Sequence, residues 1–208
     1  MNNALVDMYA KQGNLDCAFQ VFNHMPNKDV VSWTSLVIGY AHNDCHEEAL
    51  KLFCEMRMAG IYPDHVVLAG ILSACAELTV LEFGQQVHAN IVKSGLQSSL
   101  SVDNSHVTMY AKCGCIEDAS RVFDSVQIED VITWTALIIG YAQNGKGKDS
   151  VSFYDQMIAS GTKPDFITFI GLLFACSHSG LLESGRSYFA SMEKVYGIKP
   201  GSEHCLYD

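Results

Sequence analysis

The sequence predicts an all-α protein, an α-solenoid in which helical hairpins stack on one another. Three observations predict this class: a long internal repeat, a helical spacing of apolar residues inside it, and turn residues between the helical segments. A single helical hairpin cannot bury its apolar face by itself. We therefore expect each hairpin to be covered by its neighbours along the chain.

The internal repeat extends over most of the chain. The stretch DMYAKQGNLDCAFQVF, which begins at Asp7, returns as TMYAKCGCIEDASRVF 101 residues later. Trp33 recurs as Trp134 and Pro63 as Pro164 at the same separation. Because the register holds without an insertion, the long period indicates an architectural unit.

Shorter units lie within this period. One begins with the motif DVVSWTSLV and ends at AGIYPD, and its copy begins with DVITWTALI and ends at SGTKPD. Lengths of 35, 35 and 31 residues alternate along the chain. Because Met1 aligns with the third residue of a 31-residue unit, we expect the chain to be a fragment. The units are 1–29, 30–64, 65–99, 100–130, 131–165 and 166–201, and 202–208 begins a further repeat.

Each unit is expected to hold two helices. In the unit 30–64, apolar residues recur at i, i+3, i+4 and i+7 in two successive segments, the spacing of one helical face. The turn residues Asn43 and Asp44 separate the two segments, and Gly60 and Pro63 follow the second. The two faces consist of Trp33, Leu36, Val37 and Tyr40, and of Ala49, Leu52, Phe53 and Met56.

The 31-residue unit 100–130 shows the same spacing. Its second helix is expected to place Ile116, Ala119, Phe123 and Val126 on one face. We expect the two tryptophans of the chain to pack in the core rather than to contact a ligand.

Size and composition are those of a protein with a substantial core. The chain has 208 residues, of which 49% are hydrophobic and 17% charged. Its longest apolar run, VITWTALIIGYA, is about 12 residues, shorter than the roughly 20 that a membrane-spanning helix needs. The start of the chain resembles neither a signal peptide nor a transit peptide, so we expect any targeting segment to be missing from it.

The charge balance argues against a typical nucleic-acid binder. The net charge is −10, and only 13 Lys and Arg residues serve the whole chain, whereas such proteins usually carry a basic surface. Charge alone would favour a protein partner. The eight cysteines include no C-x-x-C pair, and we expect them to be reduced thiols.

The motifs resemble those of pentatricopeptide repeat (PPR) proteins, specifically the plant organellar PLS type, which alternates P, L and S repeats. The resemblance is carried by DVVSWTSLVIGYA with EEALKLFCEMRMAGIYPD, by MYAKCG in the short units, and by ILSACAEL with GQQVHANIVKSG. It covers essentially the whole chain. It implies a right-handed α-solenoid, with S units at 1–29 and 100–130, P units at 30–64 and 131–165, and L units at 65–99 and 166–201.

The resemblance implies that the array binds single-stranded RNA in a mitochondrion or chloroplast, with one base per repeat. It places the main base-reading side chains at the fifth and last residues of each unit. By the usual pairing of this family, Thr with Asp implies G and Asn with Asp implies U, giving U-G-n-U-G-n. The implied readers are Asn3 with Asp29, Thr34 with Asp64, Asn104 with Asp130, and Thr135 with Asp165.

The second residues of the units would flank the bases. Val31 and Ile132 are aliphatic and suit a wedge between flat rings, and Ser101 holds the same place in its unit. The L units offer Ala69 with Ser99 and Ile170 near Gly201, which suggest no clear base.

A structural interpretation of the four aspartates stays open beside this one. Each aspartate precedes an apolar helix start, which is the pattern of an N-cap that stabilises a helix by about 1 kcal/mol. Both roles can coexist in one carboxylate.

Three enzyme-like or metal-like patterns are rejected on their spacing, and we expect no catalytic residue, metal or cofactor. The cluster His42, Asp44, Cys45 and His46 lacks a closed four-ligand set for zinc. His46-Glu47-Glu48 lacks the P-C-x-x-C half of a deaminase motif. The segment from Gly140 to Lys146 is similar to a P-loop but has Gly147 where Ser or Thr belongs.

The leading hypothesis is therefore a non-enzymatic module for sequence-specific RNA binding in organellar RNA processing or C-to-U editing. Editing or processing factors would supply the catalysis, and no membrane partner is expected. The first alternative is an acidic scaffold, similar to tetratricopeptide repeats, that binds other proteins. The second is a chain that binds nothing strongly, since about six partial repeats offer few contacts.

Overall fold

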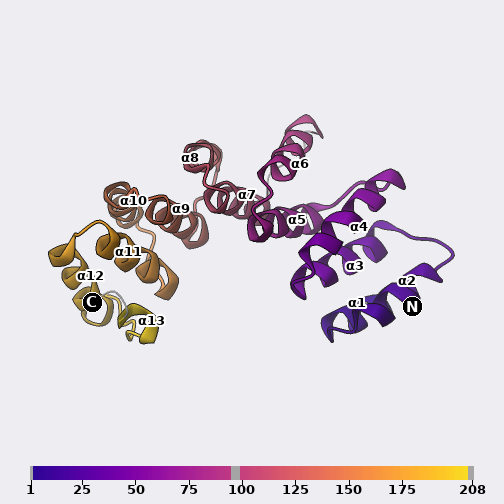
Figure 1. The fold of residues 1–208 in the computed structure, drawn as a ribbon, viewed down its shortest axis with the longest axis horizontal. Helices are drawn as coiled ribbons and strands as arrows, with labels where there is room; N and C mark the ends of the chain where they lie inside the picture. Colours follow the sequence, from indigo (N-terminus) through magenta and orange to yellow (C-terminus); the bar gives the residue numbers. More distant parts are fainter. Residues whose placement is uncertain (1, 95–98, 206–208) are drawn as a thin grey trace. The chain divides into compact units, whose positions relative to one another are not determined.

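The computed structural model describes residues 2–94 and 99–205, and within them the chain is helical without a strand (Figure 1). This confirms the predicted all-α class. The helices are α1 (Asn2–Lys11), α2 (Leu15–Asn23), α3 (Val30–His42), α4 (His46–Met58), α5 (His65–Leu78), α6 (Leu81–Ser94), α7 (Leu100–Lys112), α8 (Ile116–Ser125), α9 (Val131–Gln143), α10 (Gly147–Ala159), α11 (Phe166–His178), α12 (Leu182–Lys194) and α13 (Ser202–Cys205).

The chain forms two compact units, Met1–Met109 and Tyr110–Asp208. In the first, α1 packs on α2 and α3, α3 packs on α4 and α5, and α5 packs on α6. In the second, α9 contacts α8, α10 and α11, and α11 contacts α12 and α13. In each unit the first helices of successive hairpins lie against one another, and the second helices cover them, as expected for stacked hairpins.

The helix ends follow from the turn residues. Asn43 is the C-cap of α3, and Asp44 after it has a φ of 60°, a left-handed conformation that Asp tolerates better than most residues. Gly60, with a φ of 75°, follows α4, and glycine adopts this conformation without a steric cost. Val126 is the exception to the predicted pattern, because α8 ends at Ser125 and Val126 is its C-cap.

Both tryptophans lie in the core, as predicted. Trp33 is 5% exposed and packs edge-on against Phe22, with ring centroids 4.7 Å apart. Trp134 contacts Phe123 in the same way at 4.6 Å. Each contact joins the second helix of one hairpin to the first helix of the next, so an aromatic pair holds equivalent hairpins together in both units.

None of the helices within residues 2–94 and 99–205 has the length and apolar character needed to cross a membrane.

Candidate nucleic-acid interface

The predicted base-reading residues come from equivalent places in the fold. The residues at the fifth position lie on the first helices of their hairpins, namely α1, α3, α7 and α9. The four aspartates immediately precede α3, α5, α9 and α11. Within each compact unit, the stacking of α1 on α3, of α3 on α5 and of α9 on α11 brings the fifth residue of one hairpin toward the aspartate that begins the next.

All four aspartates are N-caps, which confirms the structural interpretation. The side chains of Asp29 and Asp64 accept hydrogen bonds from the backbone N–H groups of Ser32 and Val67, at 2.8 and 2.9 Å. Asp130 and Asp165 accept from the N–H groups three residues further on in α9 and α11, at 2.9 and 2.8 Å. Each cap engages Oδ1, so capping by itself occupies one oxygen of each carboxylate.

Asn3 and Asp29 form a direct pair. Asn3 Nδ2 donates to Asp29 Oδ1 at 3.1 Å and to Oδ2 at 3.3 Å. The hydrogen bond from the Ser32 backbone N–H lowers the pKa of the Asp29 carboxyl from its ordinary value, and the hydrogen bonds from the Ser32 and Asn3 side chains lower it further. Slight burial raises this pKa but does not outweigh the hydrogen bonds. The carboxylate therefore stays ionised, acts only as an acceptor, and fixes the orientation of the Asn3 amide.

Thr34 and Asp64 form a second direct pair. Thr34 Oγ1 contacts Asp64 Oδ2 at 3.1 Å and the backbone oxygen of Val30 at 2.7 Å. Both partners are acceptors, so the single hydroxyl proton of Thr34 is directed to one of them. Its oxygen then offers only lone pairs to a ligand.

A cavity of about 410 Å³ lies over this second pair. Its lining includes Val31, Thr34, Asp64 and Val66, together with Lys11 and His42. Val31 and Val66 are about half exposed, at 53% and 56%, in spite of being aliphatic. The cavity thus combines a polar pair with exposed aliphatic side chains from two successive hairpins.

Thr135 and Asp165 do not pair in the same way. Thr135 is 7% exposed, and its Oγ1 lies 2.6 Å from Thr168 Oγ1. Thr168 Oγ1 in turn donates to Asp165 Oδ1 at 2.8 Å. The two predicted readers are therefore connected through the Thr168 hydroxyl, which the sequence analysis did not single out.

Asn104 is a buried residue of α7 and belongs to the first compact unit. Its predicted partner Asp130 belongs to the second, where it accepts hydrogen bonds from the N–H groups of Ile132 and Thr133 at 3.0 and 2.9 Å. Each residue is described within its own unit, and their pairing stays a prediction.

The second residues of the units are exposed. The Ile132 side chain is about as exposed as that of Val31, and Ser101 is exposed as well. Val66 and Ile167, which the sequence analysis omitted, share this position and this exposure. Both could have been found from the sequence, because each stands two residues after an N-cap aspartate, as Val31 and Ile132 do.

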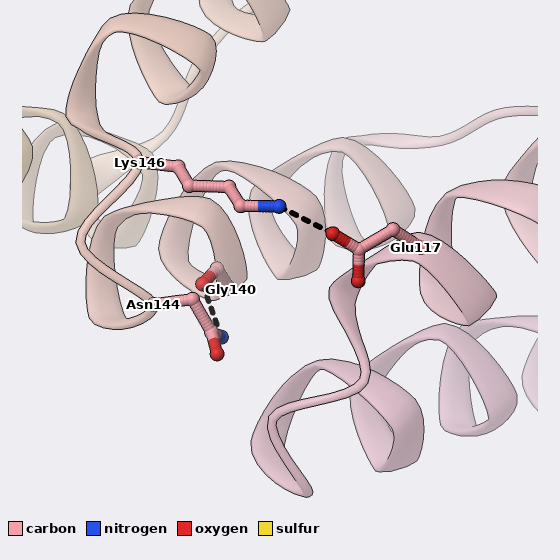
Figure 2. A network of polar contacts seen from close by, with 4 residues as sticks. All are labelled: Glu117, Gly140, Asn144 and Lys146. Atoms are coloured by element: carbon pink, nitrogen blue, oxygen red, sulfur yellow. Dashed lines mark hydrogen bonds and ion pairs between the residues drawn. The ribbon is translucent and has the colours of Figure 1, made fainter.

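The rejected motifs have structural roles. Lys146 of the P-loop-like segment forms an ion pair with Glu117, and Asn144 Nδ2 donates to the backbone oxygen of Gly140 at 2.8 Å (Figure 2). This ion pair lowers the pKa of Glu117 and raises that of Lys146. The segment is the end of α9 and the turn to α10, so it follows a helix, whereas a P-loop follows a strand.

The cluster of His42, Asp44, Cys45 and His46 at the end of α3 does not form a metal site within the part of the chain that the structure describes. His46 Nε2 is 3.9 Å from Asp44 Oδ1. Among the residues that the structure describes, no three His, Cys, Asp or Glu side chains are placed to share a metal ion.

Known proteins resemble the chain along its whole length. A mitochondrial pentatricopeptide repeat-containing protein of Arabidopsis thaliana is 45% identical to it over 100% of the chain. A chloroplastic one from the same organism is 42% identical over 99% of the chain. The chain spans 33% and 28% of their lengths, about a third of these curated relatives.

Solved structures share the fold. The crystal structure of the pentatricopeptide repeat protein PPR10 in complex with an 18-nucleotide psaJ RNA element matches with a TM-score of 0.84 and 25% identity, covering 99% of this chain and 31% of that one. The PPR domain of Arabidopsis thaliana protein-only RNase P 1, solved in complex with tRNA, matches with a TM-score of 0.66 at 12% identity, over 82% of this chain and 92% of that one. The latter similarity concerns the fold alone. These matches confirm the predicted α-solenoid class.

Family patterns match more than half of the chain. The PPR repeat family matches residues 28–77 and 129–178, and the PPR repeat matches residues 3–30. With the helical hairpins and the relatives above, these matches show that the chain belongs to the pentatricopeptide repeat family.

Proposed function

We propose that the chain binds single-stranded RNA in a sequence-selective manner, with one base for each repeat. The observation that carries the proposal is the Thr34–Asp64 pair, which lines one cavity together with the exposed side chains of Val31 and Val66. The face of a flat base can pack against such aliphatic side chains, while hydrogen bonds from a polar pair to the base edge supply selectivity. The RNA in the PPR10 complex supports the same class of ligand.

The hydrogen-bonding state of Thr34 favours guanine over adenine. Its hydroxyl proton is directed to Val30 or Asp64, so the oxygen acts as an acceptor toward a base. Guanine has a hydrogen on N1 to donate, whereas N1 of adenine is itself an acceptor. An acceptor facing that position therefore selects guanine between the two purines.

The Asn3–Asp29 pair favours uracil over cytosine by similar reasoning. Asp29 accepts from Asn3 Nδ2 and so prevents the amide from turning over. Asn3 Oδ1 can then accept from N3–H of uracil, while the remaining N–H can donate to a uracil carbonyl. Cytosine has no hydrogen on N3 and leaves Asn3 Oδ1 without a donor.

Extended to Asn104 with Asp130 and Thr135 with Asp165, this pairing gives the RNA sequence U-G-n-U-G-n, with the N-terminal repeat toward the 5′ end. The alternation of 31- and 35-residue units supports assignment to the PLS type. The names of one mitochondrial and one chloroplastic relative support an organellar location, and RNA processing or C-to-U editing in an organelle is the role that we propose. This chain would supply recognition, and another domain or partner would supply catalysis.

The experiment is a binding titration of the 208-residue chain with a U-G-n-U-G-n RNA and with its scrambled counterpart. In the wild type we expect G at the second nucleotide to bind about tenfold more tightly than A, the effect of one or two base-edge hydrogen bonds. Thr34→Asn should shift the preference at this nucleotide from G toward U. The fourth nucleotide, assigned to another unit, serves as the internal control and should keep its preference for U.

The net charge of −10 favours a second candidate, a scaffold that binds other proteins in its groove. Equal affinity for the RNA and its scrambled counterpart would support the scaffold and contradict the proposed RNA selectivity.

A further inference from the structure

Two equivalent hairpin junctions differ at a buried residue whose side chain can form hydrogen bonds in only one of them. Residue 67, the third residue of the unit that follows Asp64, is Val, and residue 168, the third residue of the unit that follows Asp165, is Thr. Both side chains are fully buried. This difference changes which carboxylate oxygens of Asp64 and Asp165 accept hydrogen bonds within the protein.

At the first junction both carboxylate oxygens have internal partners. Asp64 Oδ1 accepts from the Val67 N–H at 2.9 Å, and Asp64 Oδ2 contacts Thr34 Oγ1 at 3.1 Å. The carboxylate is used for capping the helix and for holding Thr34.

At the second junction the bonds converge on one oxygen. Asp165 Oδ1 accepts from the Thr168 N–H and from Thr168 Oγ1, both at 2.8 Å. Among the described residues, no hydrogen bond or ion pair reaches Asp165 Oδ2, and Asp165 is an exposed residue.

The protons of this network can be assigned. A carboxylate only accepts, so Thr168 donates its hydroxyl proton to Asp165. Thr135, 2.6 Å from Thr168 Oγ1, must then donate to it. Thr168 Oγ1 also accepts from the Asp165 N–H at 3.2 Å, which fills its hydrogen-bonding capacity.

We infer that Thr168 is a specificity-determining residue of the preceding unit, 131–165, because its hydroxyl holds Thr135 and leaves Asp165 Oδ2 to accept a hydrogen bond from the base. This inference rests on the proposed RNA-binding function. A free carboxylate oxygen favours guanine, which presents N1–H and the N2 amino group side by side. It disfavours adenine, whose N1 lone pair would face the negative charge.

The test compares base preference at the second and fifth nucleotides of U-G-n-U-G-n RNA, the nucleotides assigned to the units 30–64 and 131–165. In the wild-type chain the ratio of G to A affinity should be about tenfold larger at the fifth nucleotide than at the second, the effect of one hydrogen bond to a charged group. Thr168→Val should reduce the ratio at the fifth nucleotide to that at the second. Thr168→Ser, which keeps the hydroxyl, should preserve it.

Thr133→Val is the matched control for lost helix capping. Thr133 forms the same capping box with Asp130 that Thr168 forms with Asp165, but no hydrogen bond joins it to Thr135 among the described contacts. This variant should leave the G-to-A ratio at the fifth nucleotide unchanged. The reciprocal variant Val67→Thr should raise the ratio at the second nucleotide, and it carries the test if Thr168→Val does not fold.

The outcomes separate the two claims. A wild-type chain without base preference at either nucleotide overturns the proposed function and this inference with it. A wild-type chain that prefers G at the fifth nucleotide, with the same ratio in Thr168→Val, overturns only the inference. If Val67→Thr leaves the G-to-A affinity ratio at the second nucleotide unchanged, that result also overturns only the inference.

Discussion

At the scale of single residues, the aspartates show how one side chain serves two purposes. A carboxylate has two oxygens, and an N-cap needs only one of them. In Asp64 one oxygen caps α5 and the other holds Thr34. The capping and recognition interpretations are therefore compatible, and the structure shows the cap while the recognition remains a proposal.

His106 is expected to make the stability of the fold depend on pH. It is 4% exposed, its Nε2 has no hydrogen-bond partner among the described atoms, and its ring lies 4.5 Å from that of His88. Burial, with a smaller contribution from His88, lowers the pKa of His106 from 6.5 to about 3. Between these two pH values the unfolded chain binds a proton that the folded chain does not.

We therefore expect stability to fall as the pH drops below about 6.5, by up to about 1.4 kcal/mol for each pH unit. Urea unfolding at pH 7, 6 and 5 measures this. His106→Leu should remove that part of the pH dependence while leaving the contribution of the carboxyl groups. The same slope in His106→Leu and in the wild type would contradict the assignment.

At the scale of helices, glycine permits the first helices of successive hairpins to approach closely. A Cβ atom added to Gly39 in α3 would lie 2.4 Å from Ala10 Cβ in α1. One added to Gly140 in α9 would lie 2.7 Å from Ala111 Cβ in α7. The same small-residue contact therefore recurs in both copies of the repeat.

Gly39→Ala should destabilise the chain although alanine favours helix formation by about 1 kcal/mol. The added methyl group meets the rigid Cβ of Ala10, so α1 and α3 must separate, and overpacking of this kind costs about 1–3 kcal/mol. We expect a net loss of about 1 kcal/mol in the free energy of unfolding, measured by urea denaturation.

Gly70→Ala is the control. Its added Cβ would meet Ile38 Cδ1 at 2.3 Å, and this atom is the end of a side chain that can change rotamer. Gly70→Ala should therefore cost less than Gly39→Ala. The reverse order would show that backbone approach does not limit this packing.

At the scale of the whole molecule, the charge constrains how RNA could bind. A net charge of −10 with 13 Lys and Arg residues leaves few cations to neutralise phosphates. Affinity for RNA would then come mainly from stacking and from hydrogen bonds at the base edges. Lys11, which lines the cavity over Thr34 and Asp64, already forms an ion pair with Asp7 at 2.8 Å.

We expect the affinity for U-G-n-U-G-n RNA to depend weakly on salt. Each neutralised phosphate of a single strand contributes about 0.7 to the slope of log K against log salt concentration, so fewer than about three such contacts give a slope below roughly 2. Titrations between 50 and 300 mM salt measure it. A slope well above this value would mean that phosphate contacts dominate.

The sequence by itself determined the helices, the repeat and the N-caps. These features depend on neighbours within a few residues, such as the apolar spacing after Asp29 or the turn at Asn43, and the 101-residue register carries each assignment from one copy to the other. The tertiary structure alone decided which partners the candidate base readers have. Thr34 bonds to Asp64, but Thr135 bonds to Thr168, 33 residues further on, because the packing of α9 against α11 brings a second hydroxyl to Thr135, whereas α5 has Val67 at the equivalent position. Two copies of one motif thus acquire different hydrogen bonds through a residue of the next hairpin, and only the contact between hairpins shows that this residue is the partner.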